Sequence, residues 1–397
     1  MRTRYDALVI GAGPAGSMTS ALLARAGWNV ALIEKCAFPR RKVCGEFLSA
    51  PTWPIFDELG IGSALRSLAG PPIRRVGLFA RRAALYAAMP EALDLASGWG
   101  RALSREKLDR LLLDEAVWRG VSLWQPYEAV ELAHHRGIGE CRLAGAAGEH
   151  VLRAPLVVDA HGSWGRRGFA AGPRRPVRNA DLLAFKAHFE GAALATGTMP
   201  LLAFPGGYGG MVTTDDGRLC LSCCIRRDAL EACRRAYPGL RAGEAVLEHI
   251  LCSCAAVRAI LERAVRLGPW LAAGPVQPGI RQSADGGAIK VGNAAGEAHP
   301  VIAEGISMAV QGAHLLAQIL TSEGETLAGS GRLSDLHIAY TRAWRARFAT
   351  RLRFSGLIAR LAMRTEAGGL LAPLLQRHPG IITMGARLSG KTARAVC

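Results

Sequence analysis

The sequence predicts an α/β fold, α+β over the whole chain, on three observations. An apolar stretch at residues 7–10 is followed at once by three closely spaced glycines, Gly11, Gly13 and Gly16. A second strand-like segment, with a polar turn, a loop and a helix pattern, lies at residues 291–320. The length of 397 residues exceeds the usual size of one domain, so we expect two domains.

Residues 7–35 contain a complete β-α-β pattern. Residues 7–10 predict a buried strand, residues 18–26 predict an alanine- and leucine-rich helix that ends at Gly27, and a second strand ends at Glu34. This order of elements predicts a Rossmann-like, dinucleotide-binding domain.

The glycines and the acid of this pattern have distinct roles in holding a dinucleotide. Gly11 permits the tight turn, Gly13 lets the backbone approach a pyrophosphate, and Gly16 allows close packing of helix on strand. Glu34 can accept hydrogen bonds from both ribose hydroxyls and would repel a 2′-phosphate. The alternative is a glycine-rich turn without a ligand. The predicted cofactor residues in this segment also include Ala15 and Lys35.

Residues 291–320 supply a second candidate cofactor segment. The stretch VGNAAGEAHPVIAEGISMAVQ has a polar turn at Asn293, a loop with Pro300 and Gly305, and a helix that begins near Ile306. It resembles the late fingerprint of FAD-dependent oxidoreductases of the geranylgeranyl reductase and aromatic hydroxylase superfamily (flavin monooxygenase group A). The resemblance implies that Asn293, in place of the usual aspartate, contacts the ribityl chain and that the loop and helix face the flavin ring. Ala303 replaces the first glycine of that loop.

Two further segments extend the resemblance. FPRRKVCGEFLS, residues 38–49, is similar to a geranylgeranyl reductase segment that runs past the flavin, and it adds Arg41 and Cys44 as cofactor residues. In SREKLDRLLLDEA, Ser104 is a predicted helix cap, and the resemblance implies that Arg105 contacts the flavin cofactor. An exposed arginine in the first helical turn is the alternative. Together the matches imply FAD.

The expected domain organisation follows the cofactor segments. The FAD-binding domain is expected at 1–71, 99–171 and 276–330, an interleaved mixed β-sheet substrate domain at 72–98 and 172–275, and a helical C-terminal region at 331–397. Tyr208 lies where the reductases carry a lipid-pocket motif, and it either lines the pocket or packs on the sheet. Gly210 stands where that motif has tryptophan, which predicts a wider pocket or no grip on a prenyl chain.

The chemistry has three open alternatives. The favoured prediction is a monooxygenase that acts on an aromatic, quinone-like or polyketide substrate, and the next is a flavin reductase of isoprenoid double bonds. A flavin-free lipid escort is the third. Cys44, His299 and Tyr208 are the candidate catalytic residues. The resemblance implies that Cys44 and His299 lie near the flavin edge, where either could move a proton, although both could merely line the pocket. NAD(P)H is the candidate electron donor, but His161 replaces the acid of the motif associated with nicotinamide use.

The net charge of +17 indicates an anionic partner such as a phosphorylated cofactor or a membrane surface. Nucleic acid is not expected, because no recognition motif accompanies the charge. The sequence has no signal peptide or apolar span, which predicts a cytoplasmic protein, with membrane association as an addition. Cys220, Cys223 and Cys224 predict a buried strand with reduced thiols, so no metal is expected.

Residues 334–364 contain seven arginines and one acid, Asp335. Tyr340, Trp344, Phe348 and Leu352 are spaced four apart, so they share one helical face. Such a helix could lie on an anionic membrane. It could equally pack this stripe against the cofactor domain and leave its arginines in solvent, which is the favoured alternative.

Overall fold

The computed structural model describes residues 3–91, 98–163, 176–283, 287–322, 330–364 and 373–391. A five-stranded parallel sheet has the order β18 (Ile289–Lys290), β11 (Leu156–Asp159), β1 (Ala7–Ile10), β2 (Val30–Ile33) and β7 (Ser122–Trp124). The three central strands are buried over their whole length, as their continuous apolar sequences predict. This sheet confirms the predicted α/β fold.

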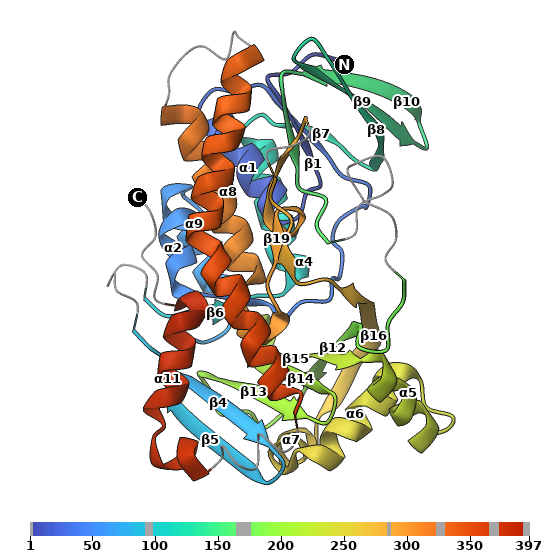
Figure 1. Ribbon diagram of the computed structural model, residues 1–397, viewed down its shortest axis with the longest axis vertical. Coiled ribbons are helices and arrows are strands. Elements are labelled where there is room, and N and C mark those ends of the chain that lie inside the picture. The colour runs from blue at the N-terminus through green and yellow to red at the C-terminus, as the bar shows by residue number, and fades with distance from the viewer. Residues whose placement is uncertain are drawn as a thin grey trace.

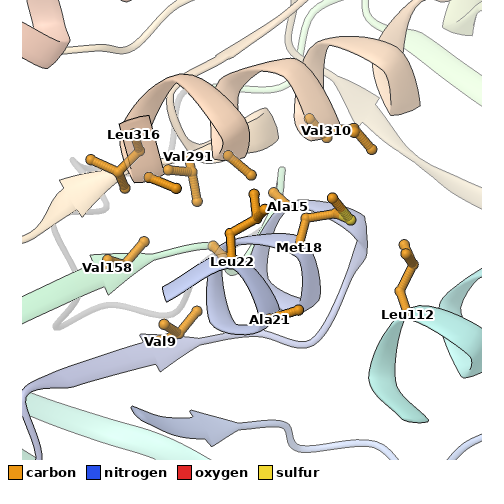
Figure 2. Packing of buried hydrophobic residues seen from close by; sticks show 14 of the residues in the cluster. Val9, Ala15, Met18, Ala21, Leu22, Leu112, Val158, Val291, Val310 and Leu316 are labelled. Carbon is orange, nitrogen blue, oxygen red and sulfur yellow. The ribbon is translucent and has the colours of Figure 1, made fainter. Parts of the chain in front are cut away.

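Three helices pack against this sheet or against one another: α1 (Pro14–Arg25), α4 (Arg105–Trp118) and α8 (Gly305–Ser322). Figure 2 shows Met18 and Leu22 of α1 on the side that faces α8, where Val310 and Leu316 lie. Segments from both ends of the chain therefore build one core. That core brings the two predicted cofactor segments to one edge of the sheet.

A seven-stranded, mostly antiparallel sheet forms the other half of the molecule (Figure 1). Its order is β16 (Val265–Val276), β12 (Leu182–Glu190), β15 (Leu219–Arg226), β14 (Gly207–Thr213), β13 (Thr198–Phe204), β4 (Arg75–Ala80) and β5 (Ala83–Ala88). One face packs in a separate apolar cluster with α5 (Arg227–Ala236), α6 (Ala242–Ser253) and α7 (Ala255–Leu261). The predicted boundary between residues 171 and 172 lies outside the described residues.

The smaller elements complete the fold, and the first of them packs on the parallel sheet. A three-stranded antiparallel sheet contains β8 (Tyr127–His135), β9 (Ile138–Gly145) and β10 (Gly148–Ala154). Two short pairs join β3 (Phe47–Leu48) to β6 (Arg101–Ala102) and β17 (Gly279–Ile280) to β19 (Gly296–Glu297). Helices α2 (Trp53–Glu58) and α3 (Gly62–Leu68) follow β3.

Helix α9 (Ser330–Ala362) runs along both halves, contacting α8 as well as β13 and β14 (Figure 1). Tyr340, Trp344, Phe348 and Leu352 are buried in the same core as α1 and α8. The aromatic stripe therefore packs inside the protein, as the second alternative expected. Helix α11 (Gly380–Ala386) covers β4 and β5. Among the described helices, none combines the length and apolarity needed to cross a bilayer.

Candidate functional site

A cavity of about 730 Å³ lies between the carboxyl edge of the parallel sheet and the seven-stranded sheet. We call it the central cavity. Gly11 and Gly13 line one end, and Leu201, Tyr208 and Met211 of the larger sheet line the other. One end therefore exposes the backbone of the glycine turn, and the other is apolar.

The glycine turn has the geometry that its sequence predicts. Gly11 has a φ of +103°, which L side chains rarely adopt. A Cβ atom on Gly16 would lie 1.8 Å from the carbonyl oxygen of Gly11, so only glycine permits this approach of α1 to the turn. Gly13 caps α1, so the unpaired N–H groups of the first helical turn face the cavity.

Two guanidinium groups stand over this turn. A Cβ atom on Gly13 would lie 3.9 Å from Nη2 of Arg105 and 4.0 Å from Nη2 of Arg40. Arg105 donates to both carboxylate oxygens of Asp109, at 2.6 and 2.7 Å. Burial opposes the charge of Arg105, but Asp109 outweighs burial and raises the pKa of the guanidinium above its usual range. Arg105 is thus held as a fixed cation beside the backbone of the glycine turn.

Arg40 is a site residue that the sequence interpretation missed. Its Nη1 donates to Glu34 at 2.7 Å, and its Nε lies buried 3.8 Å from Asp109 with no hydrogen-bond partner among the described residues. An unpaired buried donor beside the glycine turn fits an incoming phosphate or ribose oxygen. Lys35 and Arg41 also line the central cavity.

Glu34 is buried at the end of β2. Its carboxylate accepts hydrogen bonds from the backbone N–H groups of Ala12 and Cys36, both at 2.9 Å, besides the bond from Arg40. The acid therefore fixes the glycine turn itself. A carboxylate has capacity for about four hydrogen bonds, which leaves room for a ribose hydroxyl.

The late cofactor segment meets the cavity from the other side. Asn293 donates from Nδ2 to Ser163 at 2.9 Å, and Asn293, Pro300, Gly305 and Ile306 all line the cavity. Helix α8 begins at Gly305, so its positive amino-terminal end lies at the cavity wall. Ala303 has a φ of 53°, the left-handed conformation that favours the glycine usual at this place.

The three candidate catalytic residues all line the same cavity. The hydroxyl of Tyr208 lies 3.3 Å from Nδ1 of His299. Burial lowers the pKa of His299 to about 4, and the charge of Arg360 adds to this shift. Burial raises the pKa of Tyr208 well above its usual value. Both side chains are therefore neutral near pH 7.

Cys44 rests on a buried network of charges. Its Sγ accepts from the N–H of Glu46, whose carboxylate contacts Lys186 and, at 2.7 Å, His188. Burial alone would raise the pKa of Glu46, but His188 and Lys186 outweigh burial and lower it. Glu46, His188 and Cys220 could together hold a metal ion, yet Lys186 already occupies the carboxylate. The network fastens the Cys44 loop to β12.

The structure brings nearly all predicted site residues to the central cavity. Those that line it are Gly11, Gly13, Ala15, Glu34, Lys35, Arg41, Cys44, Arg105, Tyr208, Asn293, His299, Pro300, Gly305 and Ile306. Gly16 lies behind the turn and acts through packing. His161 also lines the cavity, where its Nδ1 pairs with Asp159. Cys220, Cys223 and Cys224 lie buried in β15 as free thiols.

This arrangement defines a flavin-binding protein of the Rossmann-like class. Residues 4–220, more than half of the chain, match the family model described as the FAD binding domain, and the chain belongs to that family. The predicted membership of an FAD-dependent oxidoreductase superfamily is thereby confirmed.

Known relatives cover almost the whole chain. Menaquinone reductase of Mycolicibacterium smegmatis is 25% identical over 98% of this chain and 92% of its own length. The myxobacterial chondrochloren halogenase CndH has a TM-score of 0.78 at 23% identity and covers 98% of this chain and 91% of its own. PqsL of Pseudomonas aeruginosa has a TM-score of 0.72 at 19% identity and covers 92% and 98%. The two structures show the fold alone.

Proposed function

We propose that the protein is an FAD-dependent monooxygenase that hydroxylates an apolar phenolic, quinone-like or polyketide ring. The observation that carries the proposal is the neutral pair of His299 and Tyr208 at the apolar end of the cavity. A neutral imidazole can accept a hydrogen bond from a phenol and raise the electron density of its ring. With a pKa near 4, the imidazolium form, which could act as an acid toward a carbon atom, is scarce near pH 7.

The residues of the cavity fit FAD. Gly13, Arg40 and Arg105 would hold the pyrophosphate, Glu34 the adenosine ribose, and Asn293 the ribityl chain. The amino-terminal end of α8 would lie against the flavin ring. When bound, FAD supplies the redox chemistry with oxygen, and NAD(P)H is the proposed source of electrons.

The residues of the chain would bind the substrate, orient it and exclude water from it. Met199, Leu201 and Val212 line the cavity together with Tyr208, so an apolar ring would be desolvated there. Gly210 leaves this space wide, because a Cβ atom at that position would meet nothing closer than 3.4 Å. Nε2 of His299 would then accept from the phenol, while Nδ1 carries the proton and donates to the hydroxyl of Tyr208.

Reduction of an isoprenoid double bond is the second candidate. It is favoured by the Cys44 thiol in the cavity, which could donate a proton, and by the match to menaquinone reductase over nearly the whole chain. A flavin-free lipid escort is disfavoured by the buried Arg105 and Arg40 over the glycine turn.

A comparison of turnover with and without oxygen tests the proposal. Purified holoprotein with NAD(P)H and an alkylated phenol should consume the phenol only in air. His299→Leu should lower kcat for the phenol without lowering the FAD content, since His299 would contact the substrate's hydroxyl group. Anaerobic saturation of an isoprenoid side chain, with the phenol left unchanged in air, would favour the second candidate instead.

A further inference from the structure

A second hollow of about 400 Å³ lies at the carboxyl-terminal end of α9, away from the glycine turn. Four arginines line it. Arg81 and Arg82 form the turn between β4 and β5, Arg258 belongs to α7, and Arg364 follows α9. All four are exposed, and no aspartate or glutamate is among the described residues that line the hollow.

These arginines differ from others on the surface. Arg66, Arg110 and Arg142 each pair with a carboxylate. Within the described ranges, no ion pair involves any of the four arginines of the hollow, and the contacts of Arg258 are with the neutral Leu251 carbonyl and Cys252 sulfur. Four like charges around one hollow repel one another, and a bound anion would relieve that repulsion.

Exposed apolar side chains accompany this charge. Leu357 and Leu361, on the last turns of α9, are 53% and 39% exposed, and their spacing of four puts them on one face. Ile381, Met384 and Leu388 of the C-terminal segment are also exposed. Residues 336–391 contain ten lysines and arginines against one acid. A small soluble anion would need only the arginines. The exposed leucines beside them therefore indicate a partner that has an apolar part as well as negative charge.

We propose that this surface docks on an anionic phospholipid bilayer, with lipid phosphates in the arginine hollow and Leu357 and Leu361 at the acyl boundary. A bilayer offers both components, because its phosphates lie at the surface and its acyl chains directly below. The aromatic stripe of α9 takes no part, since it is buried in the core. The docking surface is therefore the end of α9 and the β4–β5 turn. It does not depend on the reaction that the central cavity performs.

Sedimentation of the holoprotein with vesicles of phosphatidylglycerol and phosphatidylcholine tests the proposal. The double variant Arg81→Gln/Arg82→Gln should bind about 10- to 30-fold more weakly, at roughly fivefold per arginine near a charged surface. The matched control is Arg234→Gln/Arg235→Gln, which removes an adjacent exposed pair from the last turn of α5 and should bind as the native protein does. An equal loss in both double variants would overturn the proposal, because binding would then follow net charge alone.

Two further measurements distinguish lipid phosphate from free phosphate as the bound anion. Leu357→Ser/Leu361→Ser keeps every charge and should still weaken binding to vesicles severalfold. Native protein that binds inorganic phosphate through Arg81 and Arg82 but ignores the vesicles would overturn membrane docking. The thermal midpoint and FAD content of each variant should match those of the native protein, since all the altered side chains are exposed.

Discussion

Substitution of Gly13 by alanine separates binding of the cofactor from folding. Gly13 has φ −75° and ψ −177°, which alanine adopts freely, and the new Cβ atom would lie 3.9 Å from Arg105 and 4.0 Å from Arg40. These are ordinary van der Waals distances, so the free energy of unfolding should change by less than about 0.5 kcal/mol. The methyl group would nevertheless occupy the approach of the pyrophosphate. Overpacking of this size costs about 1–3 kcal/mol, which raises the Kd for FAD roughly 5- to 150-fold.

Titration of apoprotein with FAD, followed by flavin fluorescence, measures this Kd, and urea unfolding of the apoprotein measures stability. Gly16→Ala is the matched control, because its Cβ atom would lie 1.8 Å from the Gly11 carbonyl and should destabilise the fold itself. If Gly13→Ala bound FAD as tightly as the native protein, the pyrophosphate could not lie at this turn.

Three further predictions concern the same cavity. Glu34→Ala should weaken FAD binding by about 1.5–3 kcal/mol and also lower the urea midpoint, because Ala12, Cys36 and Arg40 lose their acceptor; unchanged FAD affinity would refute the ribose assignment. Gly210→Phe should raise KM for an apolar substrate with FAD content unchanged, since the added ring would enter the cavity, and an unaltered KM would place the substrate elsewhere. His299 takes up its proton near pH 4 when folded but near pH 6.5 when unfolded, so the protein should lose stability as the pH falls through this window. His299→Leu should reduce that loss, as measured by urea midpoints at pH 4 to 7.

The glycine turn and Glu34 were predictable because neighbouring residues determine them. The helix after the turn was predicted at residues 18–26, but α1 begins four residues earlier, at Pro14, because Gly13 caps it directly after the turn. Gly11, Gly13 and Gly16 act through contacts within one β-α-β unit, so their spacing alone predicts their geometry. The aromatic stripe of α9 was predictable as a face. The partner of that face was not predictable, because the same four-residue spacing suits a helix on a membrane and a helix packed in a protein core.

Contacts between distant segments escaped sequence reasoning. Arg40 and Arg41 are adjacent and chemically identical, and only the folded loop shows that Arg40 reaches Glu34 and Asp109. Glu46 meets Lys186 and His188 across 140 and 142 residues, in a register set by pairing of whole strands. A lysine or glutamate that is buried is almost always paired, so knowing that these residues are buried would have indicated the pair. The sequence alone does not show which lysines and glutamates are buried.

Oxygen labelling of the product tests the proposed function most directly. The holoprotein would be reduced without air, mixed with an alkylated phenol, and then exposed to ¹⁸O₂, with the product mass recorded. The proposal predicts a product that has gained one oxygen atom and carries the label, and a lower yield from His299→Leu at equal FAD content. A product that contains no label, or a side chain that gains hydrogen before any oxygen is admitted, would contradict it.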